Sequence, residues 1–245
     1  MRGWWWREIS GLVLPADCAG CGRRRTLLCE RCARVLHGGP VRRARPVPEP
    51  AGLPAVHAAA AYGDAVRAVI LAHKERGAMG LAAPLGRALA GAVRAAAPGS
   101  AGGAGPLLLV PVPSARRAVR ARGHDAARRI ACSAVAELRR SGRSAAVLPL
   151  LRQVRPVADQ AGLGVPERLA NVSGSMRARD AAVRLPACGV PVLVDDVMTT
   201  GASLAEAARA LRAAGGGGHP DFPGFAQVSA AVVATVPLPS VINRN

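Results

Sequence analysis

The sequence has 245 residues, of which half are apolar and 20% are charged, a balance that is typical of a globular chain and excludes an intrinsically disordered one. Lysine and arginine outnumber aspartate and glutamate by 33 to 15, which gives a formal net charge of +18. Because 32 of the 33 basic residues are arginines spread along the chain, this surplus fits a solvated basic surface as well as a partner that carries phosphate. No uninterrupted apolar stretch of about 18 residues occurs, so the sequence predicts no membrane span.

The first residues combine a basic residue with an apolar stretch that contains Trp4, Trp5 and Trp6. Arg7 and Glu8 interrupt this stretch, which is too short and too charged for a secretory signal peptide. We therefore expect a cytoplasmic protein, whose cysteines are thiols or metal ligands rather than disulfides. The tryptophans could pack on the module that follows them or on a partner.

Two Cys-x2-Cys pairs, separated by seven residues, come next in the sequence: Cys18, Cys21, Cys29 and Cys32. Each pair places two thiolates on one tight turn, and two such turns supply a closed tetrahedral set for zinc with no open position for catalysis. A redox-active Cys-x-x-Cys pair would not need two copies, and an iron–sulfur centre is a further alternative. Arg23–Arg25 lie between the pairs, either as a solvated loop or as a contact for nucleic-acid phosphates. We predict a structural zinc-ribbon module over residues 1–37.

A stretch rich in proline, glycine and arginine follows, and residues 38–55 are interpreted as a linker. Over residues 56–245 short apolar runs alternate with alanine-rich helical windows, which predicts one α/β domain with a mainly parallel sheet. Apolar residues at helical spacing predict helices over 65–77 and 81–97. The first contains Lys74, the only lysine of the chain, which is either a flexible point charge for a phosphate or an accident of composition.

The run "GPLLLVPVP" at 105–113 predicts a buried strand, which leads through a serine- and arginine-rich loop into a helix over 125–138. In this loop Ser114 offers a hydroxyl, and four guanidinium groups have the planar shape that suits phosphate oxygens: Arg116, Arg117, Arg120 and Arg122. Since arginine is common throughout the chain, a chance cluster is the alternative. A second strand is predicted over 145–151.

The segment from Leu150 to Met176 is long, polar and poorly periodic, as binding loops and lids are. Several of its side chains could close over an anionic ligand and exclude water: Arg152, Arg155, Gln160, Arg168 and Asn171. The alternative is a surface excursion that contains a short helix at "VPERLANV".

Residues 190–203 read as a buried strand, two acids, a polar turn and the start of a helix. Ligands of parallel α/β sheets bind beyond the carboxyl ends of strands, where Asp195 and Asp196 fall. The turn leads to a helix N-terminus whose free N–H groups attract an anion, and its residues add hydroxyl donors or allow a close approach of the backbone: Thr199, Thr200, Gly201, Ala202 and Ser203. The turn lacks the Gly-Lys-Ser/Thr ending of a Walker A loop, and a plain capped strand-to-helix turn is the alternative.

The two carboxylates would repel a phosphate unless they contacted a diol or a divalent cation. A ribose 5-phosphate meets both requirements. Its phosphate would lie in the turn, and its 2- and 3-hydroxyls would face Asp195 and Asp196, directly or through metal-bound water.

The helix after the turn has Leu204, Ala208 and Leu211 on one face and stops at "GGGG". The run "QVSAAVVATV" at 227–236 predicts the last strand. Cys132 and Cys188 fall in apolar surroundings and are expected to be buried thiols.

The stretch "VLVDDVMTTGAS" resembles the 5-phosphoribosyl 1-pyrophosphate (PRPP) signature of type I phosphoribosyltransferases. Together with "YGDAVRAVILAHKERG", "VPVPSARRAVRARGHDAA" and "LLRQVRPVADQAGLGVPERLANVSG", in this order, the chain is similar to the ComF family of competence-associated proteins. Two positions depart from the family pattern: His124-Asp125 stands where Phe-Asn is common, and no tyrosine follows Lys74. The resemblance implies a type I phosphoribosyltransferase fold, an N-terminal zinc ribbon and a role in DNA uptake.

The resemblance also implies an activity, in which a nucleophilic acceptor displaces pyrophosphate from Mg-PRPP. Asp195 and Asp196 would then be the catalytic residues, whose carboxylates hold the ribose diol, and residues 199–203 would bind the 5-phosphate. The pyrophosphate would be bound by four other residues, with help from the arginines of the lid: Ser114, Arg116, Arg122 and Lys74. The alternative is a non-catalytic PRPP-fold protein that handles single-stranded DNA or contacts the competence machinery, although aromatic residues for base stacking are few. The chain could also pair as a homodimer.

Overall fold

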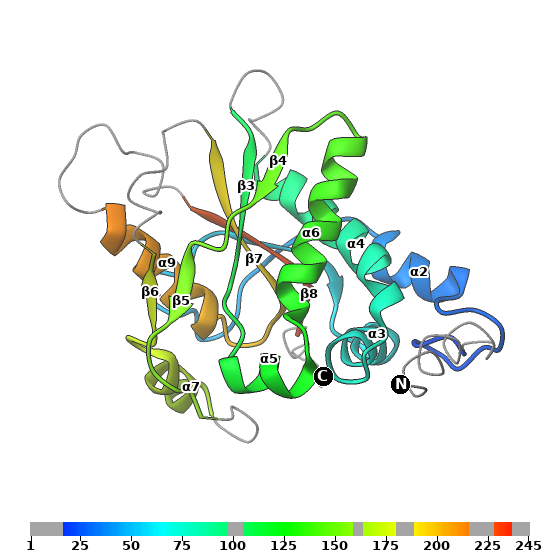
Figure 1. Ribbon diagram of the computed structural model, residues 1–245, viewed down its shortest axis with the longest axis horizontal. Coiled ribbons are helices and arrows are strands. Elements are labelled where there is room, and N and C mark those ends of the chain that lie inside the picture. Colours follow the sequence, from blue (N-terminus) through cyan, green and yellow to red (C-terminus); the bar gives the residue numbers. More distant parts are fainter. Residues whose placement is uncertain (1–16, 98–104, 159–163, 180–188, 216–227, 237–245) are drawn as a thin grey trace, which may run out of the picture.

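The computed structural model describes residues 17–97, 105–158, 164–179, 189–215 and 228–236 (Figure 1). Its main sheet has six strands in the order β1-β2-β8-β7-β3-β4. Neighbouring strands are parallel except β1 and β2, which are antiparallel. The strands are β1 (Arg42–Ala44), β2 (Val56–Ala61), β3 (Leu107–Pro111), β4 (Ala145–Val147), β7 (Val190–Met198) and β8 (Ser229–Thr235). The predicted α/β architecture with a mainly parallel sheet is confirmed.

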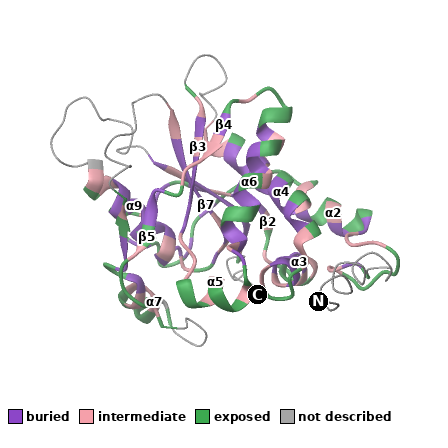
Figure 2. Ribbon diagram, viewed as in Figure 1, coloured by how far each residue is buried: buried purple, intermediate pink, exposed green. Residues whose placement is uncertain are grey.

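Helices cover both faces of this sheet (Figures 1 and 2). One face packs on α2 (Glu30–His37), α3 (Asp64–Glu75), α4 (Ala82–Ala96) and α6 (Ala126–Arg140), and the other packs on α9 (Ala202–Gly215). The central strands are therefore buried from both sides, and all five residues of β8 from Ala230 to Ala234 are fully inaccessible to solvent. Burial on both faces explains why these strands are continuous apolar runs rather than alternating ones.

The N-terminal module shares its core with the main domain. Leu36 of α2 is fully buried and belongs to the same apolar cluster as α3 and α4, and Leu27 and Leu28 pack against that cluster. A Cβ atom at Gly20 would lie 3.4 Å from the Ala65 carbonyl oxygen at the start of α3. The cysteine-bearing turns therefore rest directly on the first turn of α3.

Most predicted elements coincide with observed ones. The helices expected over 65–77, 81–97 and 125–138 are α3, α4 and α6, and the helix that follows the polar turn is α9. The strands expected over 105–113, 190–196 and 227–236 are β3, β7 and β8. The short helix at "VPERLANV" is α7 (Val165–Val172).

Three local expectations need correction. The segment 38–55 is not only a linker, because it contains β1. The strand expected over 145–151 is two strands in two sheets, since Pro149 has no N–H to continue the ladder with β3. Cys132 is an exposed thiol rather than a buried one, because it lies on the outer side of α6; Cys188 lies outside the described residues.

Residues 151–158 and 164–178 contain two strands and a helix, where the sequence indicated a loop. Strands β5 (Leu151–Gln153) and β6 (Met176–Ala178) pair antiparallel, with α7 between them. Glu206 of α9 is buried and accepts a hydrogen bond of 3.0 Å from the Met176 backbone N–H. Its two carboxylate oxygens also accept hydrogen bonds from Nε and Nη2 of Arg209, at 2.7 and 2.8 Å. Arg209 also donates to the Met176 carbonyl. This cluster holds the small β5–β6 unit on α9.

We predict that Glu206→Gln destabilises the protein by about 2 kcal/mol at pH 7, because a buried charge-assisted network loses its charge. Burial would raise the pKa of Glu206, but the hydrogen bonds from Arg209 and the Met176 amide outweigh it and hold this pKa below its ordinary value. The carboxylate therefore stabilises the fold fully above the unfolded-state pKa of about 4.3 and progressively less as the pH falls through the lower folded-state pKa.

The measurement is urea unfolding of wild type and Glu206→Gln at several pH values. The difference between them should be largest near neutral pH and shrink in acid. Glu137→Gln is the control, since its ion pair with Arg140 lies on the exposed side of α6 and should contribute less than about 1 kcal/mol. A difference at Glu206 that does not change with pH would contradict the prediction.

Among the described residues, no helix combines the length and the apolar character that crossing a membrane requires.

Candidate functional site

The acidic pair lies in the second half of β7, where the strand is still paired with β8. Asp196 is 4% exposed, and its Oδ2 atom lies 2.8 Å from Nζ of Lys74 in the last turn of α3. The Oδ1 atom of Asp195 accepts a hydrogen bond of 2.8 Å from the backbone N–H of Asp196. The two acids are thus held differently, one by an ammonium group and the other by the backbone.

The protonation of this cluster follows from burial and mutual charge. Burial, and then the charge of Asp196, raise the pKa of Asp195 well above its ordinary value. Burial acts to lower the pKa of Lys74, but the charges of Asp196 and Asp195 raise it above its ordinary value. Lys74 is therefore an ammonium at neutral pH, paired with the Asp196 carboxylate.

The polar turn after β7 has the geometry expected of a tight strand-to-helix connection. Gly201 has φ of +77°, and a Cβ atom there would lie 3.0 Å from Leu53, so the position favours glycine on both grounds. The Thr200 hydroxyl accepts a hydrogen bond of 3.4 Å from the backbone N–H of Ala202, the first residue of α9. Thr199 is exposed, and Thr200 and Ser203 are half-buried.

Strand order brings the second predicted strand end beside this turn. β3 is the direct neighbour of β7, with Pro111 opposite Val194, and the N–H of Val112 donates to the Val194 carbonyl at 2.9 Å. Ser114 follows directly, so it lies at the same edge of the sheet as Asp195 and Asp196. The two stretches that the sequence singled out as ligand sites are therefore adjacent.

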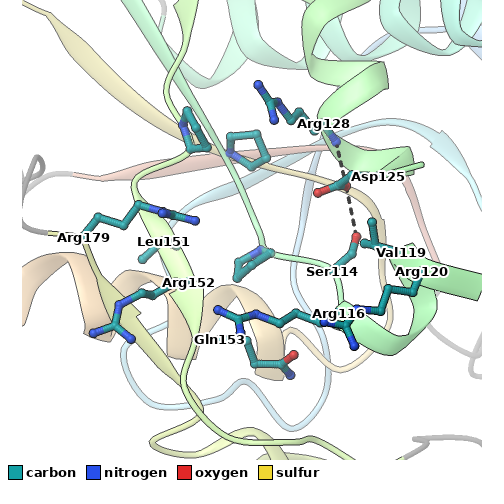
Figure 3. A pocket seen from close by; sticks show the side chains of 13 residues that line it. Ser114, Arg116, Val119, Arg120, Asp125, Arg128, Leu151, Arg152, Gln153 and Arg179 are labelled. Atoms are coloured by element: carbon teal, nitrogen blue, oxygen red, sulfur yellow. Dashed lines mark hydrogen bonds between the residues drawn. The ribbon is translucent and has the colours of Figure 1, made fainter. Parts of the chain in front are cut away.

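A cavity of about 320 Å³ opens at this edge, between α5 (Arg116–Arg122) and the small β5–β6 unit (Figure 3). Asp125 is the one acid among the described residues that line it. It caps α6 by accepting from the Arg128 N–H at 3.2 Å and also accepts from the Ser114 hydroxyl at 3.1 Å. Five guanidinium groups oppose it from both sides of the cavity, and they belong to Arg116, Arg120, Arg128, Arg152 and Arg179. The lining is strongly basic and suits a ligand with several negative charges.

The structure separates the four residues predicted for pyrophosphate. Ser114 and Arg116 line the cavity, whereas Lys74 and Arg122 are not among the described residues that line it. Arg122 instead donates through Nε to Glu75 at 3.0 Å. Lys74 and Glu75 are neighbours on α3, so both of these cations hold the end of α3 against the site.

The residues predicted for a lid also divide. Arg152 lines the cavity from β5. Asn171 accepts from the Ala158 N–H at 3.1 Å and donates to the Ala158 carbonyl at 3.0 Å, so it closes its own loop. Arg168 is half-buried in α7, and Gln160 lies outside the described residues.

Two buried histidines meet between the end of α3 and the start of α6. The rings of His73 and His124 meet edge to face with centroids 5.7 Å apart, and their Nδ1 atoms lie 3.4 and 3.1 Å from the carbonyl oxygens of Ala78 and Arg122. Burial, with His124 and Arg129 adding to it, lowers the pKa of His73, so this ring is neutral at pH 7. His124, one of the departures from the ComF pattern, thus packs α3 against the start of α6.

The four clustered cysteines form a separate site on the N-terminal module. Their sulfur atoms all lie within 4.8 Å of one another, and the Cys21 and Cys29 sulfurs are 3.6 Å apart. Zinc bound to four thiolates at about 2.3 Å requires sulfur atoms about 3.8 Å apart. The donor set and its spacing therefore fit a closed tetrahedral metal site, as the sequence predicted, and zinc is the ion that such a set favours.

The electrostatics of this site also suit a cation. Burial acts to raise the pKa of Cys18, but backbone N–H groups, that of Cys29 foremost at 3.3 Å from its sulfur, lower it to about 6. Burial and the neighbouring sulfurs raise the pKa of Cys32 well above its ordinary value. The Cys18 thiol is thus ionised at neutral pH, and a divalent ion would supply the charge that ionises Cys32.

Two of the arginines that line the cavity, Arg128 and Arg179, were not predicted from the sequence. Arg128 could have been found, since it lies one turn after the helix-capping Asp125 at the same strand end. Arg179 carried no signal, because only the antiparallel pairing of β5 with β6 and the hydrogen bond from its N–H to the Leu150 carbonyl bring it to the cavity.

No family model matches this chain, and no curated protein is significantly similar to it in sequence. The resemblance to the ComF family thus rests on the quoted motifs alone.

Proposed function

We propose that this protein binds PRPP at the carboxyl edge of β7 and β3 and transfers its ribosyl phosphate group to a nucleophilic acceptor. One observation carries the proposal. The acidic pair and its glycine-containing turn on β7 lie beside the serine- and arginine-rich end of β3, across the backbone hydrogen bond from Val112 to Val194. A ligand that carries a diol, a terminal phosphate and a pyrophosphate matches the order of groups along this edge.

The ligand would lie along the edge in a defined direction. Its 5-phosphate would occupy the turn from Thr199 to Ser203 at the N-terminus of α9, since the N–H groups at a helix N-terminus attract anions. Its ribose hydroxyls would donate to Asp195 and Asp196. Its pyrophosphate would enter the arginine-lined cavity, where Ser114 and Arg116 lie on one side and Arg152 on the other.

In the transfer, the acceptor's electron pair forms a bond to C1 of the ribose, and the bond from C1 to the pyrophosphate oxygen breaks. Pyrophosphate leaves with that electron pair, and the acceptor's proton passes to solvent. Positive charge develops on the sugar beside the carboxylates, and negative charge grows on the leaving group among the arginines, so both ends of the site favour the transition state. The small β5–β6 unit would exclude water from the reacting carbon.

The resemblance also implies magnesium. The acidic pair does not fit a resident ion, because the ammonium of Lys74 already contacts Asp196. No step above requires a protein-bound metal.

Calorimetric titration with Mg-PRPP tests the proposal. We expect wild type to bind and Asp196→Asn to lose about 10- to 100-fold in affinity, as for a hydrogen bond to a charged group. Asp64→Asn, at the exposed N-terminus of α3, removes a carboxylate from the same fold and should bind like wild type. No binding at millimolar PRPP would refute the proposal.

The same titrations separate binding from transfer. Release of pyrophosphate with one member of a panel of nucleobases would establish transfer, whereas PRPP binding without release would leave a binding protein. Affinity for single-stranded DNA that falls steeply with salt and ignores Asp196→Asn would favour the DNA-handling alternative.

A further inference from the structure

Lys74 is placed as a counter-ion of the acidic pair rather than as a ligand of the basic cavity. Its Nζ atom contacts Oδ2 of Asp196 at 2.8 Å, and the side chains of the two residues are 33% and 6% exposed. Lys74 is thus the more exposed member of the pair, and its ammonium group already occupies one oxygen of the nearly buried carboxylate. A cation that bound this oxygen would have to displace Lys74 or share the oxygen with it.

The charges around this contact are already balanced. Lys74 faces Asp196, and the next residue of α3, Glu75, is paired with Arg122 of α5. Asp195 is held by the backbone N–H of Asp196, and burial raises its pKa. The Asp196 carboxylate thus already has a cationic partner, whereas divalent cations require ionised oxygen ligands that are free to coordinate.

The identity of the residue also matters. The chain uses arginine at 32 of its 33 basic positions and lysine only here. Lysine is a compact point charge on a flexible stem, while arginine is a rigid fork. The one contact to a single carboxylate oxygen of Asp196, made from the last turn of α3, suits the ammonium.

We propose that Lys74 is the resident cation of the acidic pair: it neutralises Asp196 in place of a divalent metal ion and positions that carboxylate to accept the ribose diol. The second half, on the diol, rests on the proposed function. The first half, on cation exclusion, does not.

Cation exclusion can be tested on the zinc-loaded full chain without PRPP, by following free Mn²⁺ with electron paramagnetic resonance. Asp196→Asn should leave the Mn²⁺ binding of wild type unchanged. Lys74→Met should gain one Mn²⁺ site, with an affinity at least about tenfold higher than that of wild type, since a nearby positive charge that opposes a divalent ion has been removed. Adding Asp196→Asn to Lys74→Met should abolish the gain.

Two control variants separate charge at this contact from charge in general. Arg76→Met removes a positive charge from the same end of α3, where Arg76 donates to the Ala68 carbonyl, and it should bind Mn²⁺ like wild type. Lys74→Arg keeps the charge and should continue to exclude Mn²⁺. A wild-type site for Mn²⁺ that depends on Asp196 would overturn the inference even if Lys74→Met failed to fold, and so would equal Mn²⁺ binding by wild type and a folded Lys74→Met.

The positioning half is tested by titrating the same variants with Mg-PRPP. Lys74→Met should lower the affinity for PRPP at least about tenfold, the equivalent of one lost charge-assisted contact. Arg76→Met should leave this affinity unchanged. If wild type binds no PRPP, the proposed function falls while the Mn²⁺ results still decide the role of Lys74. If wild type and Lys74→Met bind PRPP equally, Lys74 does not position Asp196.

Discussion

Replacing Cys29 by serine is expected to abolish metal retention and to lower the melting temperature of the whole chain. The four sulfurs form one compact set, and the described residues offer no fifth cysteine, histidine or carboxylate within it. The free energy of binding a structural zinc ion is folding free energy, of order 10 kcal/mol. A loss of only about 3 kcal/mol would lower the melting temperature by about 10 °C in a chain of this size.

This effect should reach the main domain because the module is part of its core. Leu36 is fully buried among residues of α3 and α4, and the cysteine-bearing turns pack on Ala65. We therefore expect one cooperative transition at lower temperature rather than separate melting of residues 17–37.

Zinc content by elemental analysis and thermal melting by circular dichroism provide the measurements. Cys132→Ser is the matched control, since it removes an exposed thiol on α6 that is not part of the cluster; it should keep one zinc ion per chain and melt like wild type. If Cys29→Ser retained zinc and had the same melting temperature as Cys132→Ser, the structural metal site would be refuted.

Gly86→Ala should destabilise the protein by about 1–3 kcal/mol, the usual result of overpacking a core. Helices α4 and α6 cross closely at this glycine. A Cβ atom at position 86 would lie 2.7 Å from the backbone carbon of Ser133 and 2.8 Å from the backbone nitrogen of Ala134. Backbone atoms cannot rotate away as a side chain can, so the helices would have to separate.

A second glycine on the same helix supplies the control. A Cβ atom at Gly91 would meet only the Val41 side chain, at an ordinary 3.7 Å, so Gly91→Ala should stabilise α4 by about 0.5–1 kcal/mol. The same substitution is thus expected to lower the free energy of unfolding at position 86 and to raise it at position 91, about one and a half turns later. Urea unfolding of both variants measures these changes, and stability changes in the same direction would contradict the packing of α4 on α6.

The buried strands and amphipathic helices could be predicted because their signals are local. β3, β7 and β8 are apolar runs bounded by glycine, proline or polar residues, and α3, α4 and α6 show apolar residues at helical spacing. The errors have local causes too. A three-residue edge strand such as β1 has too few residues for a pattern, and Pro149 divides an apolar run that reads as one strand.

The sequence indicated several residues of the candidate site but not which of them contact each other. The turn after β7 and the serine at the end of β3 stood out by residue type, and both are at the same edge of the sheet. The partner of Asp196 could not be foreseen, because Lys74 lies on a helix whose position depends on packing over the whole sheet. Asn171 was expected at the ligand for its polarity, yet it hydrogen-bonds its own loop.

Spacing along the chain was enough to predict three features: the two cysteine pairs, the strand, acids and turn over residues 190–203, and the apolar faces of the helices. The strand that lies beside β7, the cation that faces Asp196 and the arginines that meet around one cavity became known only from the three-dimensional fold. Periodicity and turn chemistry are set by hydrogen bonds between near neighbours in the chain. Strand order and side-chain pairing are set by the burial of apolar surface among distant segments, which no local pattern records.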